Sequence, residues 1–279
     1  MFVPLLRRWI VPCVAAFAAA TVIAPACVST AVADAATATD RESEVDRFVQ
    51  HVLLSVLLHE LGHALVREFD LPVLGNEETL ADAFATHYLV THMPDLAPDV
   101  LRARIQSWTI EAGEAPRASW DISGEHDSDA RRAYETAALA IAADPQKYAF
   151  LGEMLDMSAS DMNAAADYGA EIHRSWRRTL RPLWMPDGEL SREVRLSIDE
   201  GDAVLQRLGE SALATEMEYA LRRFDWHSQV TLRFLEGDGG ASWDRSRRAI
   251  TLRRQLVDRF RKQGERVVSG ADIRMPAAE

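Results

Sequence analysis

The chain has 279 residues, of which 43 are Asp or Glu and 31 are Lys or Arg, so its formal net charge is −12 at pH 7. This acidic balance argues against a nucleic-acid binder or a general binder of anionic membranes, because such proteins present a basic surface. Hydrophobic residues make up 48% of the chain and charged residues 27%, which is typical of a folded globular protein and excludes a largely disordered one.

The first segment has the parts of a secretory signal peptide in the expected order. Two arginines precede an apolar run over residues 9–26, and small residues then alternate up to Ala35. We predict that residues 1–33 form a signal peptide, cut after Ala33 or Ala35, and that the mature protein is secreted or periplasmic without stable membrane association. An uncleaved anchor is one alternative, and a lipoprotein signal ending before Cys27 is another.

Both cysteines of the chain, Cys13 and Cys27, lie inside this predicted signal. The mature protein would therefore have no disulfide and no cysteine nucleophile. Its stability would have to come from core packing or from a bound metal.

The next part of the chain is predicted to be helical. Apolar residues recur with the period of an amphipathic helix, and Pro or Gly residues separate the periodic segments. These signals predict helices over residues 42–69, 77–91, 98–112, 128–143 and 160–180.

The last third of the chain changes character. It predicts strands over residues 194–198, 230–234 and 249–252, with helices over residues 202–224 and 256–261. The fold class is therefore α+β, mostly helical, with a small C-terminal β unit. We expect residues 36–180 to form the main domain and residues 181–279 to form an α+β region that completes or extends it, with the loop over 181–188 as the boundary.

The first predicted helix carries the sequence His59-Glu60-Leu61-Gly62-His63. Two histidines four residues apart lie on one helix face, where both imidazoles can bind one zinc ion. Glu60 lies too far round the helix to ligate well, but it can take a proton from water that zinc has acidified. Gly62 leaves room for a backbone or a metal to approach closely. The pattern predicts the chemistry of an HExxH metallopeptidase.

A catalytic zinc site also needs a third protein ligand and an open position for water. The turn over residues 71–76 can reverse the chain, so the start of the next helix would return towards the histidines. Glu78 can then be the third ligand, and the adjacent Glu77 is the alternative. Asp82, one turn further on, can accept the ring N–H of a ligand histidine.

The strings HELGHAL, LPVLG and EExxADxFAxxYL follow one another between Leu57 and Leu89. They resemble a bacterial family of metallopeptidases of otherwise unknown function, and the last string resembles the glutamate-ligand helix of the gluzincins. The resemblance implies a zincin-like domain with Zn²⁺ as the cofactor. It also implies a role for each matching residue: His59, His63 and Glu78 as metal ligands and Glu60 as the base.

A weaker part of the resemblance covers the sequence around His126, which looks like the family's (D/E)-H-S-x-D-x-x-R-x-Y stretch. His126 is a candidate catalytic residue that would donate a hydrogen bond in the transition state. The alternative is a surface histidine close to the start of the following helix.

The chain departs from the family pattern in one respect. Family members carry a strand unit before the HExxH helix, whereas here almost nothing separates the predicted signal from that helix. A similar-looking piece occurs over residues 230–260, and a permuted arrangement would supply the missing strands. Without them, the edge strand on which zinc peptidases bind substrate would be absent.

These observations predict an exported zinc-dependent metallopeptidase that hydrolyses peptide or protein substrates. One alternative is a non-catalytic protein, zinc-stabilised or simply helical, that binds a partner and retains the motif. Glu60 argues against a structural zinc, since a structural site has no use for a base. Hydrolysis of a non-peptide amide is a further alternative. No nucleotide cofactor is predicted, because the glycine run at 237–240 lacks the lysine of a phosphate-binding loop.

Overall fold

The computed structural model describes residues 26–73, 75–114 and 128–275. By internal contacts the chain divides into two compact units, Met1–Asp40 and Arg41–Glu279. Most of the predicted signal peptide lies outside the described residues. Apart from the helical residues before Arg41, the features discussed below belong to the second unit.

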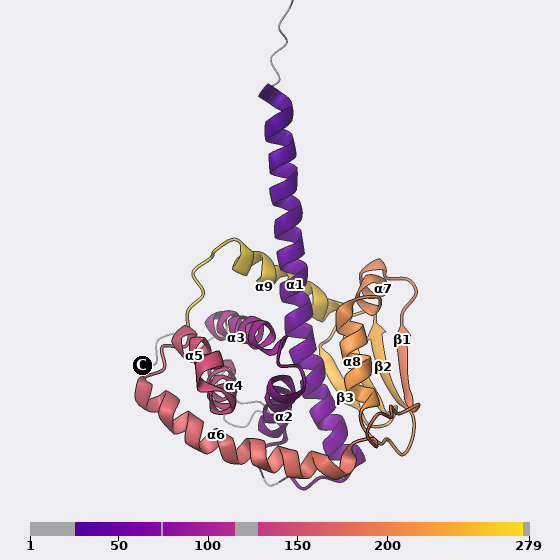
Figure 1. Ribbon diagram of the computed structural model, residues 1–279. Coiled ribbons are helices and arrows are strands. Elements are labelled where there is room, and N and C mark those ends of the chain that lie inside the picture. The colour runs from indigo at the N-terminus through magenta and orange to yellow at the C-terminus, as the bar shows by residue number, and fades with distance from the viewer. Residues whose placement is uncertain (1–25, 74, 115–127, 276–279) are drawn as a thin grey trace, which may run out of the picture. The chain divides into compact units, whose positions relative to one another are not determined.

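The described residues form a mostly helical α+β fold, which confirms the predicted fold class (Figure 1). The helices before the sheet are α1 (Ala26–Glu68), α2 (Glu77–His92), α3 (Ala97–Glu114), α4 (Asp129–Ala143), α5 (Pro145–Met154) and α6 (Ala159–Leu180). After a 3-10 turn (Arg181–Leu183) come β1 (Val194–Ile198), α7 (Ala203–Gly209), α8 (Ala212–Arg222), β2 (Val230–Leu235), β3 (Ala241–Asp244), β4 (Ala249–Arg253) and α9 (Arg254–Val268).

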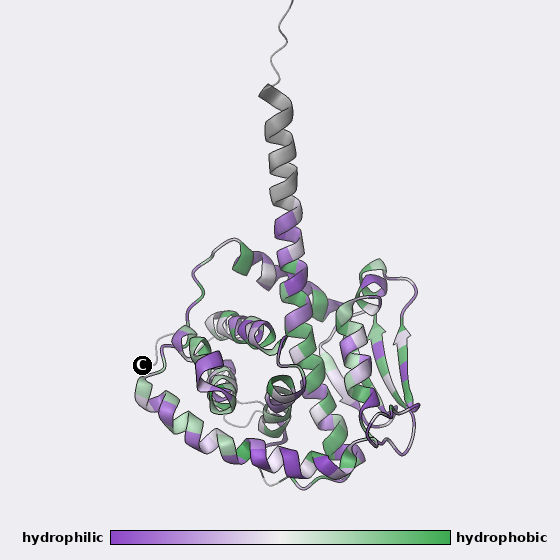
Figure 2. Ribbon diagram, in the orientation of Figure 1, coloured by the Kyte–Doolittle hydropathy of each residue, from purple (hydrophilic) through white to green (hydrophobic). Residues whose placement is uncertain are grey.

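Helix α1 is the centre of the core. From Arg41 onwards it lies between helices α2–α6 on one side and the sheet on the other (Figure 1). Figure 2 shows that this stretch starts hydrophilic and becomes mostly hydrophobic further along, where the leucines at 53, 57, 58 and 61 have no exposed surface. A helix that is apolar on all sides is expected in the interior of a protein or in a membrane. Among the described residues, Thr39–Glu68 is the one helix long and apolar enough to cross a membrane, and most of it is buried inside the protein.

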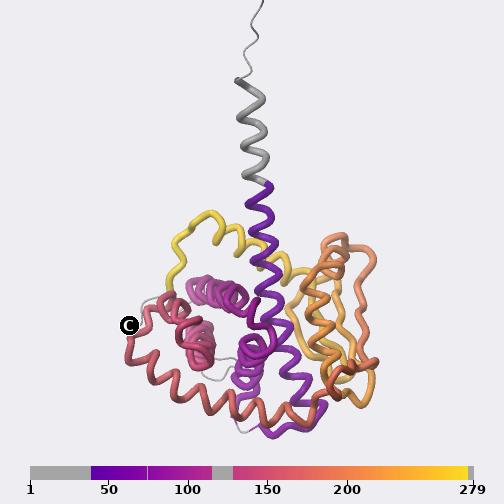
Figure 3. The backbone as a smooth tube through the Cα atoms, in the orientation of Figure 1, coloured from indigo at the N-terminus to yellow at the C-terminus, as the bar shows by residue number. Residues whose placement is uncertain are grey.

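The sheet has the strand order β1-β2-β4-β3. Strands β1, β2 and β4 are parallel neighbours, and β3 pairs antiparallel with β4 as an edge strand. Helices α7 and α8 pack on β1, and α7 also packs on β2. Figure 3 traces the chain from the sheet into α9, which crosses α1, and Gly264 of α9 contacts Val45 and Phe48 there. The C-terminal part of the chain is therefore packed against the helix that carries the histidine motif.

Helix α5 was not predicted from the sequence. Asp144-Pro145 indicated the end of α4, and it also begins α5. The Asp144 carboxylate accepts hydrogen bonds from the backbone N–H groups of Gln146 and Lys147, and Pro145 occupies the first helical position. Aspartate at the cap and proline at the first position favour a helix start as much as a helix end.

The helix predicted over residues 202–224 is two helices, α7 and α8, and this prediction was wrong in its length. Gly209 ends α7 where the backbone meets Ile198 of β1. A Cβ on Gly209 would lie 1.9 Å from the Ile198 Cδ1 atom, so a larger residue would force the Ile198 side chain to shift. The periodicity of the apolar residues continues through this break and therefore does not reveal it.

A buried histidine pair joins α2 to α6. The Nδ1 atoms of His87 and His173 are 2.8 Å apart, and the Nε2–H of His173 donates to the backbone oxygen of Leu139 at 2.8 Å. These contacts are compatible with two neutral rings, in which His87 donates and His173 accepts. Burial lowers the pKa of both rings, that of His87 to about 3. Arg177 lowers the pKa of both rings as well, and His92 lowers that of His87.

We expect this pair to make the protein sensitive to acid. An unfolded histidine has a pKa of about 6.5, so the unfolded chain binds more protons than the folded protein below that pH. Stability is therefore lost as the pH falls from about 6.5 towards the lowered folded values. Between pH 7 and pH 5, the wild type should lose about 2 kcal/mol more than His87→Gln in urea unfolding experiments. Replacing the exposed His227 with glutamine is the control and should reproduce the wild-type loss; an equal loss in His87→Gln would contradict the assignment.

Candidate metal centre

The two histidines of the motif lie on α1, and the approach of α2 completes the centre. The Asn76 side chain caps α2 by accepting a hydrogen bond from the backbone N–H of Glu78, which fixes the first turn of that helix. Gly62 lies against α2, because a Cβ there would come within 3.0 Å of the Ala81 Cα. The close approach at Gly62 is thus made by a backbone, and it brings the acidic start of α2 up to the histidines.

Three ligand atoms converge at one point. The Nε2 atoms of His59 and His63 are 3.1 Å apart, and the Glu78 carboxylate lies 3.2 Å from the first and 3.3 Å from the second. A tetrahedral zinc ion with bonds of about 2.0–2.1 Å separates its ligands by about 3.3–3.4 Å. The spacing and the chemistry of these donors therefore fit zinc. Within the part of the chain that the structure describes, this is the one group of three such side chains.

A carboxylate and an arginine stand behind His59. The Nδ1 of His59 lies 2.7 Å from an oxygen of Asp82. Arg132 donates from Nε and Nη2 to the same carboxylate, at 2.7 and 2.9 Å. With its Nδ1–H directed at Asp82, His59 presents Nε2 as the free ligand atom. Asp82 thus has the contact that the sequence analysis expected of it.

A second carboxylate and arginine stand behind His63 in the same way. The Nδ1 of His63 lies 3.0 Å from Glu77, and Arg67 contacts the Glu77 carboxylate at 2.6 and 3.1 Å. The neighbouring carboxylates of α2 are therefore directed at opposite nitrogens of one ring, Glu78 at Nε2 and Glu77 at Nδ1. Sequence reasoning missed both arginines. Arg67 could have been found, since it lies one helical turn after His63, whereas Arg132 is 50 residues from Asp82 and carried no signal.

The electrostatics of the centre favour positive charge between the ligands. Burial works against protonated imidazole, but the hydrogen bonds to Glu78 and Glu77 outweigh it and raise the pKa of His63 to about 9. The bonds of His59 to Asp82 and Glu78 likewise raise its pKa against the effect of burial. Burial would raise the pKa of Glu78, yet its bonds to the two rings hold that pKa well below the usual range. The carboxylate that stabilises these cationic rings can equally stabilise a metal cation.

Glu60 lies beside the ligands with 8% of its surface exposed. Burial raises the pKa of its carboxyl group, and the neighbouring histidines and a hydrogen bond from the backbone N–H of Trp243 act in the opposite direction. A carboxylate whose pKa is shifted towards neutrality is suited to accept a proton from water.

The candidate metal centre opens into a cleft of about 750 Å³. One wall is the α1–α2 pair, and the other is the edge strand β3 with Arg245 just after it. Because the Arg253 N–H donates to the Gly240 oxygen, alternation along the β3–β4 ladder turns the backbone groups of Ala241 and Trp243 away from β4. The edge strand β3 therefore lines the cleft. It belongs to the segment over residues 230–260, which the sequence suggested as the source of the missing strands.

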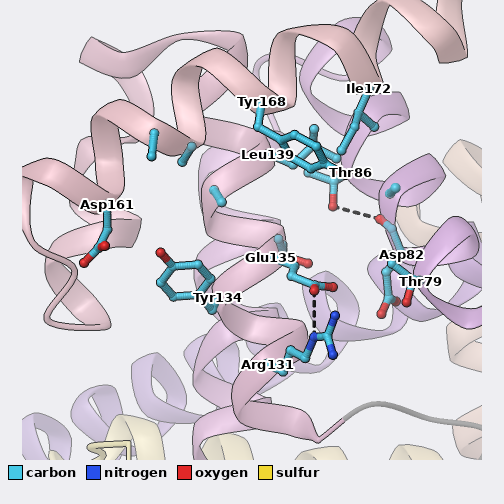
Figure 4. Close-up of a pocket in the computed structure, with 16 residues that line it drawn as sticks. Thr79, Asp82, Thr86, Arg131, Tyr134, Glu135, Leu139, Asp161, Tyr168 and Ile172 are labelled. Carbon is cyan, nitrogen blue, oxygen red and sulfur yellow. Dashed lines mark hydrogen bonds and ion pairs between the residues drawn. The ribbon is translucent and has the colours of Figure 1, made fainter.

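A second cleft of about 420 Å³ lies between α2, α4 and α6 and is shown in Figure 4. Tyr134 and Tyr168 flank it and are 40% and 74% exposed. Asp82 is the one lining residue that it shares with the contacts of the metal centre. His126, which the sequence analysis named as a candidate catalytic residue besides Glu60, lies outside the described residues.

The sequence was compared with known protein families. Residues 20–180, more than half of the chain, match the DUF4344 family, which is described as "Putative metallopeptidase". The chain belongs to the DUF4344 family. The matched region contains the described part of α1 and runs to the end of α6, so it includes the three converging ligand atoms and Asp82, while the sheet follows it. Neither the curated proteins nor the solved structures gave a match.

The two carboxylates behind the histidines give a prediction for metal affinity. Outer carboxylates orient ligand histidines, and their loss weakens metal binding about 10- to 100-fold. We expect Glu77→Gln and Asp82→Asn to raise the dissociation constant for zinc by this factor, measured by competition with a chromophoric chelator. Glu78→Gln removes a ligand and should raise it further. Glu153→Gln, at an exposed position of α5, is the control. A larger loss in Glu77→Gln than in Glu78→Gln would assign the ligand role to Glu77 instead.

Proposed function

We propose that this member of the DUF4344 family is an exported zinc-dependent peptidase that hydrolyses peptide bonds. One observation carries the proposal: a glutamate carboxylate converges with two histidine Nε2 atoms at tetrahedral spacing, beside a buried glutamate that is not part of the donor set. The family description supports a metal-dependent peptidase in general. Zinc is our choice among metals, because two imidazoles and one carboxylate form a ligand set used by catalytic zinc sites.

Each residue of the candidate centre would have its own role in the reaction. His59, His63 and Glu78 would hold the ion, and Asp82 and Glu77 would keep the two rings in the correct tautomer. Bound zinc supplies a Lewis acid that lowers the pKa of water and polarises the substrate carbonyl. Glu60 would take the proton from the attacking water and pass it to the leaving amine.

The edge strand gives a substrate chain a place to bind. The outward backbone groups of Ala241 and the outward carbonyl of Trp243 can pair with an extended peptide, which would add a strand to the sheet within the cleft, while the Trp243 N–H is held by Glu60. The Trp243 N–H that contacts Glu60 places this strand beside the base. A peptide bound along β3 would therefore run past the metal ligands.

The main rival, a non-catalytic zinc-stabilised protein, has less support. A structural zinc site is closed by four protein ligands, whereas the described residues bring three together. Glu60 would also have no role in such a site. Export is proposed from the signal-like sequence at the N-terminus.

The proposal is tested by cleavage of a peptide library with protein that is zinc-loaded, stripped by a chelator, or stripped and then resupplied with zinc. We expect cleavage in the first sample, none in the second and recovery in the third, with about one zinc per chain by elemental analysis. A protein that binds no zinc after reconstitution, or that cleaves equally well without it, would refute the proposal.

A further inference from the structure

The turn after β3 presents an arginine at the cleft. Arg245 follows the last residue of β3, lines the metal-centre cleft and is exposed. Within the ranges that the structure describes, its guanidinium has no carboxylate partner. It shares the cleft with the metal ligands and with Glu60.

The other arginines around this turn are neutralised. Arg247 donates to the Asp244 carboxylate at 2.9 Å, and Arg248 forms an ion pair with Glu68 of α1. Asp244, the acid adjacent to Arg245, also accepts the backbone N–H groups of Ser246 and Arg247, so its carboxylate is committed to the turn. Arg245 is thus held on a fixed turn without a countercharge.

The remaining charges of the cleft are also committed. The two carboxylates of α2 face the histidine rings, Glu60 accepts from Trp243, and Arg67, the other cation that lines the cleft, is bound to Glu77. Three glutamates and two arginines line the cleft. With a divalent ion in the centre, the formal charges of these groups and of the ion would add up to about one positive charge. The protein as a whole has a charge of −12, so this cleft differs in sign from its surroundings.

The position of Arg245 relates it to the reacting bond. Arg245 is two residues beyond Trp243 and begins the turn, so the Cα atoms of the two residues are at most about 7 Å apart. A peptide bound along β3 would therefore bring a group one or two residues from the reacting bond within reach of the guanidinium.

We propose that Arg245 selects peptides that carry a carboxylate within about two residues of the cleaved bond. This inference rests on the proposed peptidase function and names its substrate class. An arginine binds a carboxylate through two parallel charged hydrogen bonds, a geometry that lysine does not offer. The carboxylate can belong to an Asp or Glu side chain or to the free C-terminus of the peptide, and the experiment distinguishes these two sources.

The experiment uses one neutral parent peptide in matched versions: with a single Glu on either side of the cleaved bond, with the isosteric Gln at the same place, and with a free or an amidated C-terminus. Cleavage gives kcat/KM for the zinc-loaded wild type, Arg245→Gln and Arg247→Gln. The last variant is the control, since Arg247 has the same charge, lies in the same turn and does not line the cleft. Fluorescence anisotropy gives the affinity of the same peptides for zinc-loaded Glu60→Gln, with and without Arg245→Gln.

We expect the wild type and Arg247→Gln to prefer one carboxylate-bearing version over its neutral counterpart by about 10- to 100-fold, and Arg245→Gln to cleave the two versions with equal kcat/KM. A preference for Glu over Gln assigns the side chain, and a preference for the free over the amidated end assigns the C-terminus. Equal cleavage of charged and neutral peptides, or a preference that survives in Arg245→Gln, overturns the inference and leaves the peptidase intact. If no peptide is cleaved, the peptidase proposal fails. In that case the anisotropy measurements decide whether Arg245 binds carboxylates.

Discussion

Replacing Glu60 with glutamine is expected to lower kcat/KM for peptide hydrolysis by about 10²- to 10⁴-fold, the range attributed to general acid–base catalysis. Glutamine has nearly the shape of glutamate and can still accept the hydrogen bond from the Trp243 N–H, but it cannot take a proton from water. The measurement is steady-state cleavage of a fluorogenic peptide by the wild type and the variant at equal zinc content.

The same variant separates catalysis from metal binding. Glu60 is not part of the converging donor set, so Glu60→Gln should retain about one zinc per chain and a wild-type unfolding temperature. Full cleavage activity in the zinc-loaded variant would remove Glu60 from the mechanism. Loss of zinc together with activity would mean that Glu60 supports the ion and would leave its role as base without support.

Replacing His63 with alanine is expected to abolish stable zinc binding. The change removes one of three ligands and also leaves the Glu77–Arg67 pair without the ring that it orients. The zinc content, measured by elemental analysis after gel filtration, should fall from about one ion per chain to near none. In the wild type, zinc at a thousandfold excess over its dissociation constant should stabilise the fold by about 4 kcal/mol, because it binds the folded protein and not the unfolded chain.

Thermal unfolding with and without zinc tests this linkage. The wild type should show a higher Tm with zinc, and His63→Ala should show the same Tm in both conditions. His51→Ala is the matched control, since His51 lies two turns earlier on α1 and outside the converging group. If His63→Ala still binds one zinc and is stabilised by it as the wild type is, the ion lies elsewhere.

Much of the helical part could be predicted from the sequence, because local rules determine it. The starts of α2 and α4 and the position of β1 follow from caps and apolar periodicity, which act within a few residues. The exceptions arise where the same local signal has two meanings. Asp-Pro both ends α4 and begins α5, and the break between α7 and α8 lies at a glycine that packs against Ile198 of the preceding strand. Strand β3 has only four residues, too few to show a period.

The candidate site likewise has a part that the sequence predicts and a part that it does not. The sequence by itself determined that His59 and His63 share a face and that Glu60 stands beside them, because helix geometry alone fixes a spacing of four residues. It could not decide how the adjacent Glu77 and Glu78 are used, since their directions depend on how α2 approaches α1 at Gly62.

Only the tertiary structure placed Arg132 behind Asp82, and only it brought β3 to the cleft with its Trp243 N–H on Glu60. These contacts join segments far apart in the chain, and no local pattern records which distant residue will meet a given side chain. The physical reason is that the buried α1 packs against partners on several sides. The sequence of α1 therefore determines that it is a core helix with both histidines on one face, and the packing around it determines which charges and which strand surround that face.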